Sequence, residues 1–466
     1  MDIAMIGLGV MGRNLVLNMA DHGFAVVGYD RDAPKLDAMR NEAQGRSVRV
    51  AQTSQELIAL LEPPRAVMML VPAGPPVDAV IRDLMPRLVP GDQIIDGGNS
   101  HFTDTDLRTK ALAEKGIGFL GVGISGGERG ARHGPSMMPG GDQAAYERVR
   151  KIFEACAAQV NGEPCVCYLG TGSAGHYVKM VHNGIEYGLM QIIAESYALM
   201  KQGLELSDDE LHDVYDQWNQ GELSSYLLEI TAHIFHQVDE KTGGRLIDVI
   251  LDQAKQKGTG MWTSQDAMAL QTPVPTIDVA VSMRDLSGAK SERLAASKLP
   301  RGPARAFDRD RDVFLQQLQG ALYAAMIVTY AQGMALLRSG SRAYGFGLNL
   351  EAVARIWRGG CIIRAALLDD IRAACKAQPN LANLLVDPRI GQAVFERQNA
   401  LRSVVMAAAE FGIPAPGLAV SLAYFDGYHS EWLPANLIQA QRDCFGAHTY
   451  ERIDEKGTFH TEWRED

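Results

Sequence analysis

Hydrophobic and polar residues alternate in two different ways along the first 172 residues. Short apolar runs with the length of buried strands stand at residues 3–6, 25–29, 66–71, 93–96 and 118–121. Amphipathic stretches with the period of an α-helix, such as 11–22 and 77–88, separate them. Strands that alternate with helices form βαβ units. The pattern therefore predicts an α/β domain with a mostly parallel sheet over residues 1–172.

The pattern changes after residue 172, where long stretches of helical period replace the short apolar runs. These stretches cover residues 176–201, 208–217, 225–235, 314–337, 352–358, 361–374 and 394–411. They predict a large all-helical domain over residues 173–430. Its most apolar run, 321–331, is bounded by Gln319 and Gln332 and fits a buried core helix. No apolar stretch of about 18 residues is free of strongly polar side chains, so no membrane span is expected.

Residues 431–466 have a different character from the rest of the chain. They are polar, and Pro434, Gly446 and Gly457 interrupt them. Their apolar content is too small for a separate core. We therefore expect an extended C-terminal tail that packs on another part of the protein or on a second subunit.

Charge and cysteine content exclude several kinds of protein. Lys and Arg number 45 against 56 Asp and Glu, which gives a net charge of −11. An acidic balance of this size argues against nucleic-acid binding, so any anionic ligand needs a local group of cations. The six cysteines form no CxxC pair, and Cys165-x-Cys167 has no matching second pair, so no metal site is expected. Scattered thiols without a predicted signal peptide favour a cytoplasmic location.

A glycine-rich segment follows the first predicted strand and opens the first helix. Its residues are Gly7, Leu8, Gly9, Val10, Met11 and Gly12. Gly23 ends that helix, and Asp30, at the end of the second predicted strand, stands 21 residues after Gly9. In a Rossmann domain the glycines allow a tight turn and a close approach of the backbone to a pyrophosphate. This context favours dinucleotide binding over a purely structural turn.

The residues after the second strand leave the choice of dinucleotide open. Asp30 could hold a ribose 2′-hydroxyl, which favours NAD. Arg31 could meet a 2′-phosphate and stack on adenine, which favours NADP, and its alternative is a solvated surface charge. Asp32 adds a second carboxylate beside them.

Five polar residues share one face of the predicted helix 176–201. Lys179, His182, Asn183, Glu186 and Tyr187 have the spacing i, i+3, i+4, i+7 and i+8. A solvated face usually repeats Glu, Lys and Arg, whereas this set combines a base, an amide, an acid and a phenol. The mixture favours an active site over a solvent-exposed helix face.

This stripe and several other motifs resemble the decarboxylating 6-phosphogluconate dehydrogenase family of the β-hydroxyacid dehydrogenase superfamily. The segment 179–187 carries the resemblance most specifically. Supporting motifs stand at residues 96–100, 123–128, 134–141, 257–260 and 439–443. The resemblance covers nearly the whole chain. It implies an α/β Rossmann N-terminal domain, a large all-α domain and an extended C-terminal tail.

The resemblance also implies an activity and two catalytic residues. The family oxidises and decarboxylates 6-phosphogluconate to ribulose 5-phosphate and CO2 while it reduces NADP or NAD, in the pentose phosphate pathway and in gluconate utilization. Lys179 matches the general base of the family and Glu186 its general acid. A lysine needs a lowered pKa to act as a base, and a glutamic acid needs a raised pKa to act as an acid near neutrality.

The resemblance assigns binding residues as well. The substrate residues it implies are Asn99, Ser125, Gly126, Gly127, His182, Asn183, Tyr187, Lys257, Thr259 and Arg284. It further implies a homodimer in which the tail delivers Arg442 and His448 into the neighbouring subunit's site. The cofactor residues it implies are Gly7, Leu8, Gly9, Val10, Met11, Gly12, Asp30, Arg31, Asp32, Val71, Pro72, Ala73 and Asn99.

Four positions depart from the pattern of the family. Asp30 and Asp32 replace an amide and a hydroxyl, and Pro72 and Met261 each replace a lysine. All four changes make the surroundings of bound anions less positive, so we expect NADP but keep NAD or dual use open. Two other functions remain as alternatives: a related β-hydroxyacid dehydrogenase acting on an unphosphorylated acid, and a nucleotide-binding protein without catalysis.

Overall fold

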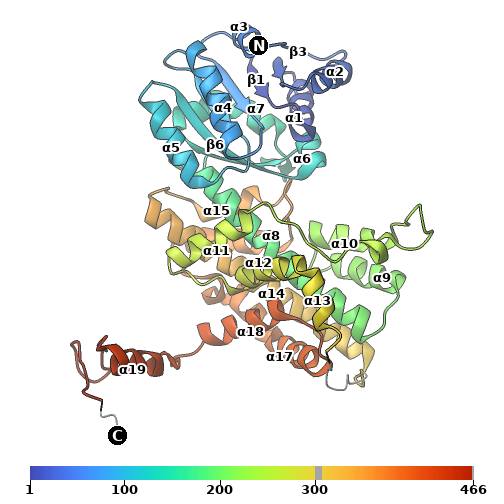
Figure 1. Ribbon diagram of the computed structural model, residues 1–466, viewed down its shortest axis with the longest axis vertical. Helices are drawn as coiled ribbons and strands as arrows, with labels where there is room; N and C mark the ends of the chain where they lie inside the picture. The colour runs from blue at the N-terminus through green and yellow to red at the C-terminus, as the bar shows by residue number, and fades with distance from the viewer. Residues whose placement is uncertain (300–306, 464–466) are drawn as a thin grey trace. The chain divides into compact units, whose positions relative to one another are not determined.

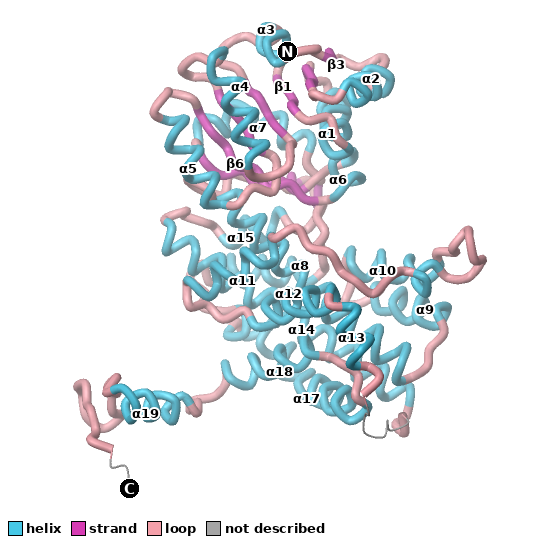
Figure 2. The backbone as a smooth tube through the Cα atoms, viewed as in Figure 1, coloured by secondary structure: helices cyan, strands magenta, loops and turns pink. Residues whose placement is uncertain are grey.

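The computed structural model describes residues 1–299 and 307–463 and is shown in Figures 1 and 2. The chain divides into two compact units, Met1–Ser421 and Leu422–Asp466. The first unit contains a sheet of seven strands followed by a bundle of helices. The predicted α/β class with a helical second half is therefore confirmed.

The strands follow the spatial order β3-β2-β1-β4-β5-β6-β7. Their bounds are β1 Ile3–Ile6, β2 Val26–Tyr29, β3 Val48–Val50, β4 Ala66–Met69, β5 Gln93–Asp96, β6 Gly118–Ser125 and β7 Ser136–Gly141. All pairs are parallel except β6 with β7. The chain first places β2 and β3 on one side of β1 and then crosses over to place β4 on the other side, so the strand order reverses between β1 and β4. In such sheets ligands bind outside the carboxyl ends of the strands at this position.

Two strands of this sheet lie outside the sequence-based prediction, as does a separate two-stranded sheet of β8 Gln159–Val160 and β9 Glu163–Pro164. β3 has three residues that are not fully buried, so it lacks an apolar run. β7 reads Ser-Met-Met-Pro-Gly-Gly, and proline and glycine disfavour a strand. β7 tolerates Pro139 because it is the edge strand of the sheet.

Helices cover both faces of the sheet. α1 Val10–Asp21, α2 Ala33–Glu42 and α7 Gln143–Cys156 pack on one face, and α3 Ser54–Ala59, α4 Pro75–Leu84 and α5 Phe102–Ala113 pack on the other. A short helix, α6 Gly127–His133, follows β6. Burial on both faces explains why the strands read as continuous apolar runs.

The second half of the first unit is a helix bundle. Its helices are α8 Ala174–Ala198, α9 Asp208–Asn219, α10 Tyr226–His236, α11 Thr259–Ala269, α12 Pro275–Gly288, α13 Lys290–Ala296, α14 Arg311–Tyr344, α15 Leu350–Ile356, α16 Leu367–Ala377, α17 Pro388–Phe411 and the start of α18 Pro416–Tyr428. α14 is long and apolar enough to cross a membrane, but 89% of its most apolar window is buried inside the protein. It is therefore the expected core helix.

The predicted helix over residues 361–374 begins too early. α16 starts at Leu367, and residues 361–366 form turns and a bridge. Gly360 precedes them with a φ of +65°. A glycine in the left-handed region stops helix propagation, so the apolar residues after it belong to a loop.

Glycines let the start of α8 lie directly on β6 and β7. A Cβ atom on Gly175 of α8 would stand 2.2 Å from the carbonyl oxygens of both Gly121 and Met138. A Cβ atom on Gly123 of β6 would stand 2.3 Å from the Cβ atom of Lys179. Only residues without side chains allow this approach, which fixes Lys179 against the carboxyl half of β6.

The second unit is organised around one carboxylate. Asp443, in α19 Ala435–Gly446, is fully buried. It accepts hydrogen bonds from the backbone N–H groups of Thr449 and Thr461, from the Trp463 indole and from His460. Large apolar side chains stay exposed around it, namely Trp432, Leu433, Leu437, Ile438, Phe445, Ile453 and Trp463.

We expect Gly175→Ala to lower the free energy of unfolding by about 2 kcal/mol or more, since the added methyl group overpacks the contact between α8 and the sheet. Gly320→Ala in α14 is the matched control, because its added Cβ meets only ordinary contacts from 3.5 Å. The control should be neutral or stabilising by up to about 1 kcal/mol. Urea unfolding measures both, and equal stabilities would contradict the role given to this contact.

Candidate active site

Most of the polar stripe of α8 is withdrawn from solvent: Lys179, His182 and Tyr187 are buried, and Asn183 and Glu186 are partly buried. Lys179 is 6% exposed and His182 is fully buried. The Lys179 Nζ atom donates a hydrogen bond to Asn183 Oδ1 at 2.7 Å. The structure therefore places the stripe inside the protein, where titratable groups are strongly affected by loss of solvent.

Asn183 connects the members of the stripe. Its Oδ1 atom accepts from Lys179 and also lies 3.1 Å from His182 Nδ1, so the proton of the imidazole sits on Nδ1. Its Nδ2 atom donates to Thr259 Oγ1 at 3.0 Å. Burial and the nearby Lys179 place the pKa of His182 well below its usual value, so this histidine is neutral. The amide thus fixes the orientation of the lysine, the histidine and the threonine.

Ser125, at the carboxyl end of β6, completes this cluster. Its Oγ atom lies 3.2 Å from His182 Nε2, which is the free acceptor of the neutral ring. The same oxygen accepts a hydrogen bond from the backbone N–H of Ile362 at 3.3 Å. Gly126 follows with a φ of +119°, and a Cβ atom there would stand 2.5 Å from the Gly360 oxygen. Residues 360–362 therefore contact the turn 125–127 and fix its position.

Burial shifts the pKa values of Lys179 and Glu186 in opposite directions. Desolvation lowers the pKa of Lys179, although the charge of Glu186 opposes the shift. Desolvation raises the pKa of Glu186, against the opposing charges of Lys179 and Arg284. Glu186 Oε2 lies 3.8 Å from His182 Nδ1, so acid, imidazole, amide and amine follow one another along the helix. The pair has the properties of a base and an acid.

A cationic side chain lies at the C-terminal end of the stripe, and a second one precedes the helix that packs beside it. Arg284 of α12 lies over the ring of Tyr187, with its Cζ atom 3.4 Å from the ring centroid. Lys257 is exposed and precedes Gly258, which begins α11. The Arg284 guanidinium also donates to the sulfur of Met190 at 3.5 Å, and within residues 1–299 and 307–463 neither Arg284 nor Lys257 has a carboxylate within ion-pair distance. Both cations therefore remain available to an anionic group.

Asn99 lies in the loop after β5, at the carboxyl edge of the sheet, and its side chain is exposed. The neighbours Gly98 and Ser100 are buried and hydrogen-bonded to Asp96. The hydrogen bonds to Asp96 thus fix the backbone on both sides of Asn99, while the Asn99 side chain stays exposed.

The glycine-rich turn lies at the carboxyl end of β1, as predicted. A Cβ atom on Gly12 would stand 1.9 Å from the Gly7 oxygen, so the turn between them requires glycine, whereas Gly9 has open space above it. A cavity beside this turn is lined by Ile6, Gly7, Tyr29, Asp30, Arg31, Val71, Pro72, Pro76, Val80 and Asp83. The turn leaves room for a pyrophosphate, and the cavity has the apolar walls that an adenosine needs.

Not every predicted cofactor residue lines that cavity. Leu8 is buried beneath the turn, and Val10 is exposed at the start of α1. Met11 is partly buried against the core. Asp32 and Ala73 adjoin lining residues in the chain without lining the cavity themselves.

The carboxylate of Asp30 is already engaged. Its Oδ2 atom accepts the backbone N–H of Leu8 at 2.7 Å, and Oδ1 accepts the N–H of Asp32 at 3.0 Å. Lys35 Nζ stands 3.6 Å from the carboxylates of both Asp30 and Asp32. A cation that the sequence reasoning missed thus offsets the two acids beside Arg31.

Arg442 and His448 belong to the second unit, where both side chains are exposed. Arg442 Nη1 donates to Gln439 Oε1 at 3.0 Å, and His448 packs edge-on against Phe445. Their contribution to a neighbouring subunit remains a prediction.

Comparison with known proteins agrees with this geometry over both halves of the chain. The model of the NAD binding domain of 6-phosphogluconate dehydrogenase matches residues 2–170, and the model of the 6-phosphogluconate dehydrogenase C-terminal domain matches residues 175–463. The chain belongs to the 6-phosphogluconate dehydrogenase family.

Similar 6-phosphogluconate dehydrogenases come from distant organisms. The decarboxylating enzyme of Synechococcus elongatus is 54% identical, with 99% of each chain covered. The NADP(+)-dependent, decarboxylating enzyme of Bacillus subtilis is 50% identical, again with 99% of each chain covered. A Plasmodium falciparum 6-phosphogluconate dehydrogenase, solved in its apo form and with NADP+ or 6-phosphogluconate, has a TM-score of 0.96 and 44% identity over 99% of this chain and 100% of its own.

Two features of the site escaped the sequence reasoning. The loop 360–362 that supports Ser125 was hidden because residues 361–374 have a helical period and were predicted as a helix, and its local signal is the pair Gly359-Gly360. Lys35 follows Asp32 by three residues in a helix, a spacing that predicts an ion pair. Both could have been found from these local signals.

Proposed function

We propose that this protein oxidises and decarboxylates 6-phosphogluconate to ribulose 5-phosphate and CO2, with NADP as the hydride acceptor, in the pentose phosphate pathway of the cytoplasm. The observation that carries the proposal is the pair on one buried helix face. Lys179 has a lowered pKa and Glu186 a raised one, and Asn183 and His182 lie between them. Such a pair can take a proton at one end of a substrate and give one at the other.

Lys179 starts the reaction as a neutral amine. It accepts the proton of the substrate's C3 hydroxyl, while the C3 hydrogen leaves as hydride. The nicotinamide, when bound, supplies the hydride acceptor. Asn183 Oδ1 holds the Lys179 Nζ atom at 2.7 Å and so directs its lone pair or its proton toward the substrate.

Decarboxylation then uses the protonated amine. The C1–C2 bond of the 3-keto acid breaks, CO2 leaves, and the electron pair moves to the C3 oxygen. The Lys179 ammonium stabilises this oxygen and returns the proton to it. Glu186, protonated because of its raised pKa, then protonates the carbon that lost CO2 while Lys179, again a neutral amine, takes back the proton of the C3 enol hydroxyl, which yields the ketone of ribulose 5-phosphate.

The remaining polar groups bind the two charged ends of the substrate. Ser125 and the N–H groups of Gly126 and Gly127 form a turn suited to the carboxylate and hydroxyls, together with Asn99 and His182. The phosphate is expected at the cations beside the stripe. Its ligands are Tyr187, Lys257, Thr259 and Arg284. Arginine suits this role because its fork donates two parallel hydrogen bonds.

The cavity beside the glycine-rich turn fits the adenosine of NADP. Arg31 and Lys35 lie near the place of a 2′-phosphate, while Asp30 and Asp32 oppose its charge. Balanced charges of this kind support the use of NADP together with some use of NAD.

A homodimer completes the site in this proposal. The exposed apolar side chains of residues 422–466 support it, since they need a covering surface. We place Arg442 and His448 of each tail in the site of the neighbouring subunit.

The pH dependence of kcat should be bell-shaped. Activity falls at low pH, as Lys179 becomes protonated through its lowered pKa and can no longer accept a proton. It falls at high pH as Glu186 ionises through its raised pKa. Glu186→Gln should lower kcat by a factor of about 10²–10⁴ and remove the alkaline limb of the pH profile.

The Lys179→Met variant should bind NADP but show no turnover, because it has no amine to accept the proton. A wild-type kcat in that variant would refute the assignment of Lys179 as the base.

Replacing the two acids beside Arg31 should increase the preference for NADP. Asp30→Asn keeps an oxygen for the Leu8 N–H, and Asp32→Ser removes the second charge. We expect the double variant to raise the ratio of kcat/KM for NADP over NAD by about tenfold, since about 1.4 kcal/mol corresponds to tenfold. Asp37→Asn, which alters an exposed acid paired with Arg40, is the control. An unchanged ratio would contradict the electrostatic account.

Co-expression tests whether the tail acts on the neighbouring subunit. Lys179→Met and Arg442→Ala should each give inactive homodimers. In a heterodimer, the subunit with intact Lys179 receives intact Arg442 from its partner, so one site works. Random pairing should therefore restore about a quarter of wild-type activity. Absence of any recovery in purified heterodimers would show that each tail serves its own subunit.

A further inference from the structure

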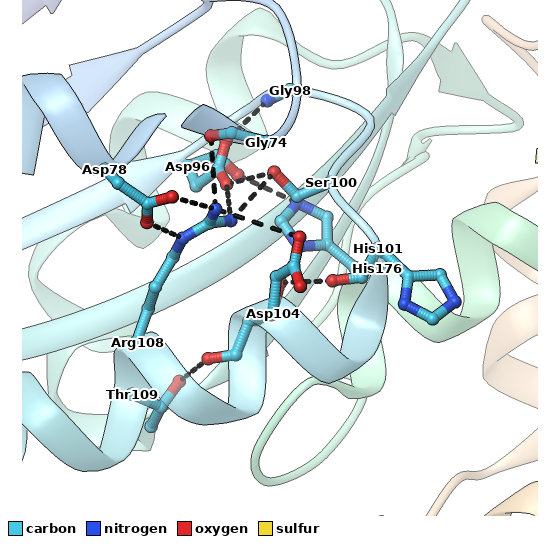
Figure 3. Close-up of polar contacts among 11 residues, drawn as sticks. Gly74, Asp78, Asp96, Gly98, Ser100, His101, Asp104, Arg108, Thr109 and His176 are labelled. Carbon is cyan, nitrogen blue, oxygen red and sulfur yellow. Dashed lines mark hydrogen bonds and ion pairs between the residues drawn. The ribbon is translucent and has the colours of Figure 1, made fainter. Parts of the chain in front are cut away.

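A buried polar network lies at the carboxyl ends of β4 and β5, outside the residues that the proposed mechanism uses (Figure 3). Arg108 of α5 stands at its centre, and only 7% of its side chain is exposed. Figure 3 shows its guanidinium reaching toward Asp78 on one side and toward Ser100 and Asp96 on the other. The network therefore touches two separate loops at the cofactor edge of the sheet.

On one side Arg108 holds the loop that leads into α4. Its Nε and Nη2 atoms donate to the two oxygens of Asp78 at 2.7 and 3.1 Å. Nη2 also donates to the Gly74 carbonyl at 3.2 Å. Gly74 is the last residue of the loop that contains Val71, Pro72 and Ala73. The hydrogen bonds from the Arg108 guanidinium to Asp78 and Gly74 therefore fix the position of the end of that loop.

On the other side Arg108 holds the loop that carries Asn99. Ser100 donates its only hydroxyl proton to Asp96 Oδ2 at 2.6 Å and accepts from Arg108 Nη1 at 3.4 Å. Asp96 Oδ1 accepts the N–H of Gly98 at 3.0 Å. The residues before and after Asn99 are thus tied to one buried carboxylate.

The same aspartate also contacts the catalytic helix. The carbonyl oxygen of Asp96 can only accept, so His176 Nε2, at 3.1 Å, carries the proton. Burial lowers the pKa of His176, so the ring is neutral and its Nδ1 atom accepts from Thr105 Oγ1 at 2.7 Å. His176 stands three residues before Lys179 in α8. Asp96 therefore belongs both to the Asn99 loop and to the support of the helix that carries the base.

We propose that Arg108 is a positioning residue for the cofactor, which holds the loops 71–74 and 97–100 at a fixed separation and, through Asp96 and His176, in register with Lys179. The inference rests on the proposed function. Among the residues that the structure describes, the network has no hydrogen bond or ion pair with Lys257, Thr259 or Arg284, so its loss should weaken cofactor binding and leave the phosphate end of the substrate site intact.

Calorimetry with NADP tests this role directly. Arg108→Gln should raise the Kd for NADP at least tenfold and the KM for 6-phosphogluconate by a clearly smaller factor, because Asn99 is one of several groups placed on the substrate. Arg108→Lys should recover part of the affinity, since a lysine keeps the charge but loses the fork. Asp78→Asn, which changes a partly exposed partner, should give a smaller rise in the same direction and serves if Arg108→Gln does not fold.

Arg397→Gln is the matched control. Arg397, in α17, also donates two hydrogen bonds to a single carboxylate, that of Glu222, and it is far from Arg108 in the sequence. Loss of the Arg397 guanidinium should therefore lower the Tm without changing the Kd for NADP. An unchanged Kd in both Arg108→Gln and Asp78→Asn would overturn the proposal. So would an equal weakening of NADP and 6-phosphogluconate that follows the fall in Tm. A wild-type protein that binds NADP without turning over 6-phosphogluconate would refute the proposed function alone, because the calorimetric comparison does not depend on turnover.

Discussion

The active site depends on how closely α8 approaches the sheet. Glycines at positions 121, 123 and 175 carry no Cβ atom, so the backbone of α8 at Gly175 lies against the backbone of β6, and the His176 and Lys179 side chains lie directly on Gly121 and Gly123. This approach buries Lys179 and brings the stripe next to Ser125 at the end of β6. A larger residue in this contact would separate the base from the substrate turn and admit water. Packing of backbone on backbone thus sets the electrostatics of the site.

Burial is one cause with two opposite effects in this site. Loss of solvent disfavours whichever form of a group is charged, so it lowers the pKa of an amine and raises that of a carboxylic acid. Lys179 and Glu186 share one helix face and therefore one environment. Asn183 and the neutral His182 satisfy the polar atoms between them without adding charge. The helix thereby produces a base and an acid without a metal ion in the arrangement proposed.

How far the sequence predicts this site depends on how local each relation is. The spacing of Lys179 and Glu186 follows from helix geometry alone, so the stripe was predictable from residue positions. The contact of Ser125 with His182 joins distant segments, and only the resemblance to the family indicated it. The support of Ser125 by Ile362 depends on an irregular loop whose helical period led to the prediction of a helix. Asp30 was one possible ribose ligand among open alternatives, and its bond to Leu8 N–H depends on a rotamer that the sequence does not encode.

In the proposed function, the cations beside the stripe explain how an acidic protein can bind a substrate that carries both a carboxylate and a phosphate. Elsewhere in the described chain many arginines are neutralised by carboxylates, such as Arg372 by Glu163 and Glu351. Arg284 instead rests on the ring of Tyr187, which attracts the guanidinium by its π-electrons and leaves its N–H donors unoccupied by an anion. An aromatic support thus orders the arginine while preserving its charge. The net charge of −11 then repels anions everywhere except where such unneutralised cations are gathered, and selectivity for a phosphorylated acid follows from that contrast.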